Sequence, residues 1–339
     1  MSNKHHAPIA AELSHWPPEA AERLAGLIAR HAHSGAYAVF DADNTSYQHD
    51  LIGAFLPFLE ARGVLTRETM NPALKLIPFL DVGGQRESLH SYYLRLGDID
   101  DQVGYPWASQ IFAGLRLREL KVHLDAMLAS GTPIQTSCFE DGAMRTMTVT
   151  PPRMLPGQQQ LYRVLQAHGI EVWVVSAACE ELVRMVLADP RYGYHVKPQN
   201  VVGVSLLLRS PDGAQVTTAR KLIAEGRYRP EDLLDHELTP SLWAPAPWYE
   251  GKQAAIHTYI HGWKRPILVA GDTPASDGPM LFRGPDVERG ALRLFVLRKQ
   301  AYHEDLRRMQ AEHLAHQVEH RHPVTAGDNW LVVRPEELG

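Results

Sequence analysis

Two aspartates and a threonine directly follow a short apolar run near the start of the chain. Residues 37–40 (YAVF) indicate a buried strand, and Asp41, Asp43 and Thr45 come immediately after it. Carboxylates placed so close together share a cation, share a proton or lie on the surface by accident. At this point a metal site, an acid–base pair and an ordinary polar surface all remain open.

Two later apolar runs also end in polar side chains. Residues 170–175 are a β-branched run ending at Ser176, where we expect a helix to begin at once. Residues 266–270 predict another buried strand, and Asp272 and Asp277 follow it. Ligands of parallel sheets bind beyond the carboxyl ends of the strands, so we expect these three polar sets to converge at one edge.

A set of this composition suits phosphoryl transfer. Asp41 and Asp272 can hold Mg²⁺, which favours one or two carboxylates together with substrate phosphate. Donors for phosphate oxygens are two hydroxyls and one ammonium: Thr45, Ser176 and Lys252. Asp41 would attack phosphorus, while Asp43 would protonate the leaving oxygen and later activate water. The two neighbouring carboxylates would thus divide the labour.

The elements that must position these residues alternate along the chain. Helical periodicity dominates from residue 51 to about residue 128, and the last of these helices is expected to stop at Gly131. Pro211-Asp212-Gly213 predicts a hairpin turn between two strand-like runs. Strand and helix otherwise alternate, which predicts an α/β fold with a Rossmann-like parallel sheet covered on both faces.

Composition limits the class of protein. The chain has 339 residues, enough for about two domains, with 45% hydrophobic and 22% charged residues, as in ordinary globular proteins. A net charge of −5 argues against a nucleic-acid partner. No apolar run approaches the roughly 20 residues of a membrane span, so no membrane partner is expected. Oligomeric state is left open.

The compartment and the state of the cysteines are also expectations. The first residues lack the apolar segment of a signal peptide, which favours a cytoplasmic protein, with a periplasmic one as the alternative if an export signal was removed. Cys138 and Cys179 have no CxxC spacing. Two free thiols are expected, and a single disulfide stays open.

Four motifs in this order resemble those of the haloacid dehalogenase superfamily of phosphohydrolases: DADNT, VVSA, GK and GDTPASD. The resemblance implies Mg²⁺ as cofactor, phosphorylation of Asp41, and acid–base work by Asp43. It implies that Ser176 and Lys252 bind the phosphoryl group. The implied metal set is two carboxylates, one backbone carbonyl and one more carboxylate at the metal or its waters: Asp41 and Asp272, Asp43, and Asp277.

From about Glu12 to about Phe295 the chain is similar to bacterial phosphorylcholine phosphatases, through segments such as SYYLRLGDIDDQVGYPW. That likeness implies a helical cap inserted after the first motif, giving residues 1–50 and 131–339 as core and residues 51–130 as cap. The sequence departs from it twice. No glutamate stands in residues 50–58, where choline-binding relatives are expected to carry one, and Ala275 replaces an aspartate of the fourth motif.

Aromatic and acidic residues of the expected cap and its entry could bind a quaternary ammonium group. The candidate π-faces are Tyr47, Tyr92, Tyr93, Tyr105 and Trp107. Asp100 and Asp101 could add negative charge, although such residues are more often solvated. The leading hypothesis is a Mg²⁺-dependent phosphomonoesterase acting on a small phosphate ester such as phosphorylcholine. A phosphotransferase using the same aspartyl phosphate and a catalytically silent binding protein are the alternatives.

Overall fold

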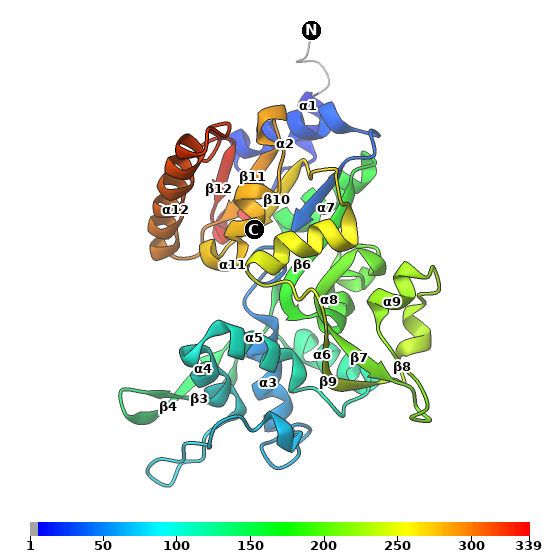
Figure 1. The fold of residues 1–339 in the computed structure, drawn as a ribbon, viewed down its shortest axis with the longest axis vertical. Coiled ribbons are helices and arrows are strands. Elements are labelled where there is room, and N and C mark those ends of the chain that lie inside the picture. Colours follow the sequence, from blue (N-terminus) through cyan, green and yellow to red (C-terminus); the bar gives the residue numbers. More distant parts are fainter. Residues whose placement is uncertain (1–5) are drawn as a thin grey trace.

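A central sheet of eight strands organises the chain (Figure 1). The computed structural model describes residues 6–339. Six neighbouring strands run parallel in the order β12, β11, β10, β1, β6 and β7, and β8 and β9 pair antiparallel with β7. The strands of the sheet are β1 (Tyr37–Phe40), β6 (Glu171–Cys179), β7 (Val201–Arg209), β8 (Val216–Thr217), β9 (Glu237–Trp243), β10 (Leu268–Gly271), β11 (Leu292–Val296) and β12 (Trp330–Val333). The predicted α/β fold with a mostly parallel sheet is confirmed.

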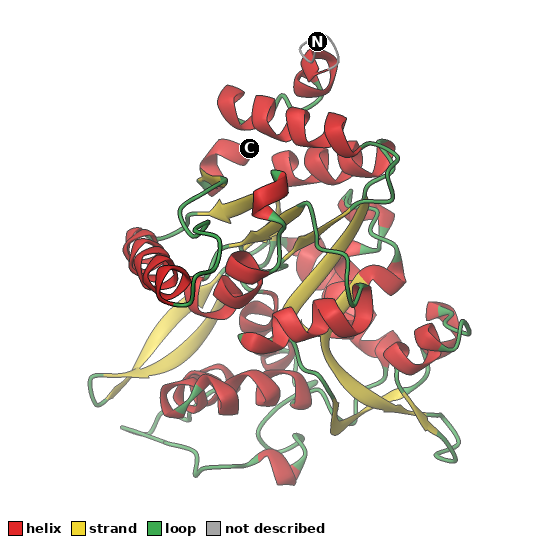
Figure 2. Cartoon of the chain, turned by 45° about the horizontal axis from the view of Figure 1, so that its top comes forward, coloured by secondary structure: helices red, strands yellow, loops and turns green. Residues whose placement is uncertain are grey.

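Helices cover both faces of this sheet (Figure 2). Side chains alternate between the faces along each strand. Ala38 and Phe40 of β1 join one apolar cluster with α2 and α7, whereas Tyr37 and Val39 join another with α10, α11 and α12. These helices and three further ones of the core have the following bounds: α1 (His6–Ala11), α2 (Pro18–His31), α7 (Pro156–Ala167), α8 (Glu180–Leu187), α9 (Ala219–Ala224), α10 (Glu250–Ala255), α11 (Pro274–Arg283) and α12 (Gln300–Glu319). β1 is therefore enclosed on both sides, and only its end is free to present polar groups.

Turn and cap residues fulfil the expectations drawn from sequence. Gly131 ends α6 (Leu117–Ser130) with a φ of 58°, a left-handed conformation that glycine adopts without strain. The Pro211-Asp212-Gly213 turn connects β7 to β8 in an antiparallel hairpin. Both cysteines are free. None of the helices in residues 6–339 combines the length and apolar character of a transmembrane segment.

β6 differs from its prediction. It runs past Ser176 to Cys179, so the next helix begins at Glu180 and not directly after Ser176. The pairing of β6 with β7 shifts register between Val175 and Cys179. The start of α8 is fixed by a contact across the sheet, because the Gly203 amide donates to the Glu180 carboxylate at 3.0 Å. A contact with a residue so far along the chain left no local signal in the sequence.

Four helices and a hairpin lie together below the sheet in Figure 1: α3 (Leu51–Ala61), α4 (Leu89–Ile99), α5 (Asp101–Gln110), α6, and the strands β3 (Ile134–Glu140) and β4 (Ala143–Val149). The hairpin follows residue 130 in the chain, yet β3 packs against α3 and α4. Ser88 Oγ, at the start of α4, donates to the Ser137 carbonyl of β3 at 2.9 Å. We propose that the hairpin belongs to the cap, which would then extend beyond the residues 51–130 expected from sequence. A pair of two-residue strands, β2 (Tyr47–Gln48) and β5 (Arg153–Met154), closes the segment where it rejoins the core.

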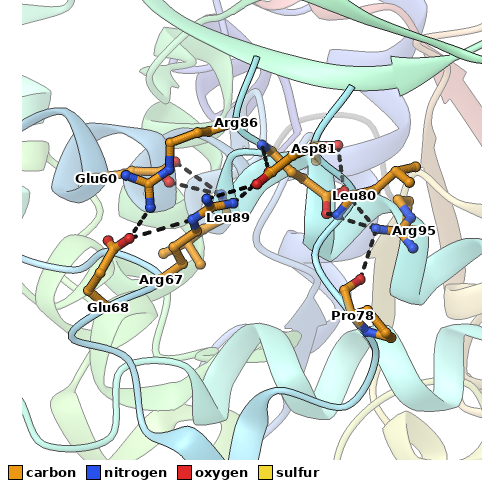
Figure 3. A network of polar contacts seen from close by, with 11 residues as sticks. Glu60, Arg67, Glu68, Pro78, Leu80, Asp81, Arg86, Leu89 and Arg95 are labelled. Carbon is orange, nitrogen blue, oxygen red and sulfur yellow. Dashed lines mark hydrogen bonds and ion pairs between the residues drawn. The ribbon is translucent and has the colours of Figure 1, made fainter. Parts of the chain in front are cut away.

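A polar network holds the long connection between α3 and α4 (Figure 3). Arg67 forms a double hydrogen bond with Asp81, at 2.6 and 3.0 Å. Glu87, which is 2% exposed, accepts from the Leu80 amide at 2.6 Å and pairs with Arg95 at 2.8 Å. Charged groups thus replace the regular backbone ladder that this connection lacks.

Glu87→Ala should lower the free energy of unfolding by about 2–4 kcal/mol, because it leaves a backbone amide and a partly buried guanidinium without their acceptor. Glu68→Ala is the matched control. The Glu68 side chain is 59% exposed and pairs with the exposed Arg86 and, at 3.5 Å, with Arg67. Surface pairs of this kind contribute about 0–1 kcal/mol. Urea unfolding curves measure both changes, and equal losses in the two variants would contradict this account of the network.

Candidate active site

The carboxyl ends of three adjacent parallel strands deliver the predicted polar residues to one edge. Asp41 follows β1, Ser176 lies in β6, and Asp272 follows β10. β1 pairs with both of the other strands, and the Asp41 amide donates to the Ala270 carbonyl at 2.9 Å. The convergence expected from sequence is therefore present.

Three carboxylates meet at this edge. Asp41, Asp272 and Asp277 each offer an oxygen, and these oxygens lie within 4.8 Å of one another. The three residues are buried, with exposures of 6%, 2% and 0%. Asp277 Oδ2 accepts from the amides of Asp272 and Thr273, both at 2.9 Å, which fixes the turn that follows β10.

Lys252 bridges two of these carboxylates. Its Nζ lies 2.7 Å from Asp41 Oδ1 and 2.5 Å from Asp277 Oδ1. Burial alone would lower the pKa of Lys252, but the charges of Asp277 and Asp41 outweigh it and raise that pKa. The lysine therefore stays protonated and places a positive charge between Asp41 and Asp277.

The ammonium of Lys252 and the guanidinium of Arg298, which pairs with Asp272, supply two positive charges against three buried carboxylates. Burial, followed by repulsion from Asp277, raises the pKa of Asp41 to about 8, and the same two causes raise the pKa of Asp272 to about 6. Neighbouring carboxyl groups whose pKa values are raised by mutual repulsion are a favourable site for a cation, because a bound cation would stabilise their charged forms. Oxygen ligands alone favour a hard cation such as Mg²⁺.

Asp43 lies beside this cluster. Burial, with the charges of Asp50 and Asp41, raises the pKa of Asp43 well above its usual range. Its Oδ1 accepts from the Leu51 amide at 2.9 Å, which ties it to the start of α3. A raised pKa favours the protonated form of a carboxyl group, which is the form that a general acid requires.

Most of the motif residues line a small cavity. It has a volume of about 110 Å³ and opens between the sheet edge and the helices α3 and α5. The lining residues are Asp41, Asp43, Asn44, Asp50, Ile52, Tyr93, Tyr105, Ala108, Ser176, Ala177, Ala178, Lys252, Asp272, Thr273, Ser276 and Arg298. A larger cavity of about 730 Å³ lies between α11 and α12, but it contains none of the motif residues.

Thr45 lies outside the cavity lining, although a phosphate contact was expected there. Its side chain is fully buried, and Oγ1 faces Asp272 Oδ1 at 3.5 Å. Thr45 therefore contacts a carboxylate of the cluster and not the cavity. Ser176, in contrast, lines the cavity, and its Oγ accepts from the Ala178 amide at 3.2 Å.

Only two of the five expected aromatic residues reach the cavity, Tyr93 and Tyr105. Tyr47, Tyr92 and Trp107 have no exposed surface and pack in the core, which corrects the expectation that they face a ligand. Two of them serve the connection between α3 and α4. The Tyr92 hydroxyl bonds with the amide and carbonyl of Ile77, and Trp107 Nε1 donates to the Leu74 carbonyl.

The two acidic candidates of α5 have structural partners. Asp100 caps the helix, accepting from the Gln102 amide at 2.7 Å. Asp101 accepts from the hydroxyl of Tyr249, the residue immediately before α10, which begins at Glu250. Neither lines the cavity, whereas Asp50 belongs to its lining together with Tyr93 and Tyr105.

The two sequence departures have local explanations. Gly53 lies in the first turn of α3, where a Cβ atom would stand 3.1 Å from Asp50 Oδ1. A larger residue would thus crowd the capping bond of 2.6 Å that the Gly53 amide donates to Asp50. Ala275 is exposed on α11 and lies outside the cavity lining.

Arg298 lines the cavity and was not foreseen. It follows β11, and its Nε forms an ion pair with Asp272 Oδ2. The rule that found Asp41 and Asp272, a polar residue just beyond an apolar strand, also applies to residues 292–298. The prediction missed it because it considered only acidic and hydroxyl groups at those positions.

Comparison with known proteins identifies a close sequence relative and a solved structure of similar fold. No family model matches it. It is 55% identical over 329 residues to the phosphorylcholine phosphatase of Pseudomonas aeruginosa, a match that covers 97% of this chain and 94% of that protein. A protein of unknown function from Anaerococcus prevotii has the same fold, with a TM-score of 0.59, 20% identity and coverage of 88% and 90% of the two chains. A substrate-bound phosphoserine phosphatase aligns with a TM-score of 0.39 and 12% identity over 80% of this chain and 90% of that one, too weakly to carry an argument.

Fold, site and relatives together define a phosphoric monoester hydrolase of the haloacid dehalogenase superfamily. The motifs DADNT, VVSA, GK and GDTPASD of this chain resemble those of that superfamily. Within that superfamily, the chain belongs to the family of the phosphorylcholine phosphatase from Pseudomonas aeruginosa.

Asp43→Asn should slow the hydrolysis of alkyl phosphates far more than that of aryl phosphates. Alkoxide leaving groups need a proton in the transition state, and general acids contribute about 10²–10⁴-fold. The measurement is kcat/KM for an alkyl phosphate and for p-nitrophenyl phosphate in both proteins. Equal losses for the two esters would remove Asp43 from the acid role.

Proposed function

We propose that the protein is a Mg²⁺-dependent phosphomonoesterase that works through a phosphoryl group on Asp41. The observation that carries this proposal is the position of Asp41, which lines the cavity within a buried carboxylate cluster and against the ammonium of Lys252. A carboxylate in this setting can attack an anion that it would otherwise repel, because fixed positive charge lies beside it.

The donor set supports Mg²⁺ as the cofactor. Asp41 and Asp272 would hold the ion, with the Asp43 carbonyl as a further ligand and Asp277 at the ion or its waters. When bound, Mg²⁺ offsets negative charge on the phosphoryl oxygens. The raised pKa values of Asp41 and Asp272 fit this assignment, since a divalent cation would restore the ionised carboxylates.

The chain's own residues then divide the reaction. Ser176 and Lys252 hold phosphoryl oxygens, and an oxygen of Asp41 forms a bond to phosphorus. The bond from phosphorus to the ester oxygen breaks, and Asp43 gives its proton to that oxygen. Asp43 next takes a proton from water, whose oxygen attacks phosphorus. The bond between Asp41 and phosphorus breaks, which releases phosphate and restores both carboxyl groups.

The far end of the cavity supports a small organic headgroup. Tyr93 and Tyr105 offer aromatic faces, and Asp50 offers the carboxylate that sequence reasoning had expected nearer Gly53. A relative named phosphorylcholine phosphatase makes phosphorylcholine the reference substrate. Gly53 supplies no carboxylate, and Asp50 Oδ1 is already bonded to the Gly53 amide at 2.6 Å. We therefore propose a phosphatase that hydrolyses phosphorylcholine slowly or prefers another small phosphomonoester.

Asp41→Asn should abolish turnover while leaving the fold intact, since the amide keeps the shape of the side chain but is no nucleophile. Wild-type protein, quenched in acid during turnover of a ³²P-labelled ester, should carry label that the variant lacks. Circular dichroism provides the folding control. Normal turnover by Asp41→Asn would overturn the assignment of the nucleophile.

We expect the enzyme to hydrolyse small phosphate esters with little selectivity for the choline headgroup. The measurement is kcat/KM for phosphorylcholine, phosphorylethanolamine, phosphoserine and p-nitrophenyl phosphate at one Mg²⁺ concentration. Each cation–π contact contributes about 0.5–2 kcal/mol, so two tyrosines provide only a modest preference. A preference of about a hundredfold for phosphorylcholine over p-nitrophenyl phosphate, or about 2.7 kcal/mol of transition-state binding, would contradict the expectation.

A further inference from the structure

Arg298 forms the one ion pair of Asp272 among residues 6–339. It lies two residues beyond β11, the strand next to β10, so the parallel sheet brings it to the same edge as the carboxylates. The Asp272 side chain is 3% exposed and that of Arg298 is 25% exposed, so the pair is largely shielded from water at the wall of the cavity. Interactions between charges are strong in such surroundings.

The two oxygens of Asp272 have different neighbours. Oδ2 faces Arg298 Nε and the Thr273 hydroxyl, the latter at 3.1 Å, whereas Oδ1 faces the Thr45 hydroxyl at 3.5 Å. Asp41 and Asp277 are both held by Lys252. Each carboxylate of the cluster is therefore already paired with a cation belonging to the chain.

Arg298 also has partners that do not depend on Asp272. Its guanidinium carbon lies 4.8 Å from the centre of the Tyr302 ring, and Nη2 lies 3.3 Å from both the Tyr302 hydroxyl and Thr273 Oγ1. The aromatic face and two hydroxyls would keep the guanidinium beside the cavity when its hold on Asp272 weakens. The side chain is thus placed to exchange one partner for others without leaving the site.

We propose that Arg298 is an internal counter-ion of Asp272 that opposes divalent-cation binding at the carboxylate cluster. It stabilises the cluster before an ion arrives, and it keeps the ion's affinity below the value that three carboxylates alone would give. This inference rests on the proposed metal site, because the ion and the guanidinium act on the same carboxylate. Lys252 differs from it in position, since it bridges Asp41 and Asp277 and forms no ion pair with Asp272 among residues 6–339.

The experiment is isothermal titration of the EDTA-treated, desalted protein with MgCl₂ at constant ionic strength, so no catalytic readout is needed. Arg298→Met removes the charge at similar length and should lower the dissociation constant by about tenfold, because like-charge repulsion is lost. Arg298→Lys keeps the charge and should stay within about threefold of wild type. Arg308→Gln removes an exposed charge on α12 that pairs with Asp305 and Glu312, and it should also stay within about threefold.

Thermal unfolding gives a second readout. The metal-free Arg298→Met protein should unfold at a lower temperature than metal-free wild type, and a fixed Mg²⁺ concentration should raise its Tm by more, since tighter ligands stabilise more. The inference is overturned if Arg298→Met binds Mg²⁺ no more tightly than wild type. It is also overturned if Arg308→Gln gains as much Mg²⁺ affinity as Arg298→Met.

Asp272→Asn separates this inference from the proposed function. If wild type binds Mg²⁺ and Asp272→Asn does not, the metal site stands, and the result for Arg298→Met decides the role of the arginine alone. If Asp272→Asn binds Mg²⁺ as wild type does, or wild type binds none, the proposed site is wrong and the role of Arg298 is wrong with it.

Discussion

The buried ionic bridge from Lys252 to Asp41 and Asp277 is the interaction on which the site depends. Burying a carboxylate without a partner is costly, and two neighbouring ones repel each other as well. The lysine makes their burial tolerable while leaving the cluster short of positive charge. This imbalance is what fits the site for a divalent cation and an anionic substrate.

The three residues of this bridge come from different elements of the fold. Asp41 and Asp277 follow different strands, and Lys252 comes from the helix that precedes β10. Parallel pairing of β1 with β10 sets the separation of the two carboxylates, and the register leaves no freedom for one to slip past the other. Strand pairing therefore fixes Asp41 beside the turn that holds Asp272 and Asp277.

The other end of the cavity is built differently. Tyr93 and Tyr105 come from helices that pack below the sheet, and Asp50 belongs to the turn that starts α3. These elements are held by side-chain contacts such as those of Trp107 and the network around Glu87, not by strand pairing. In this protein Asp41, Ser176 and Asp272 stand in or directly after strands of the sheet, while Tyr93 and Tyr105 stand on the helices α4 and α5.

The sequence by itself determined the parallel sheet, the end of β1 at Phe40 and the motif residues Asp41, Asp43, Ser176, Lys252 and Asp272. Each of these follows from periodicity and order along the chain, which local steric and burial preferences control. Only the tertiary structure decided that Tyr93 and Tyr105 line the cavity while Tyr47, Tyr92 and Trp107 do not, that β6 continues past Ser176, and that Arg298 pairs with Asp272. The reason is that a local pattern shows which residues are apolar or polar, whereas the direction in which each side chain points depends on elements distant in the sequence packing against it.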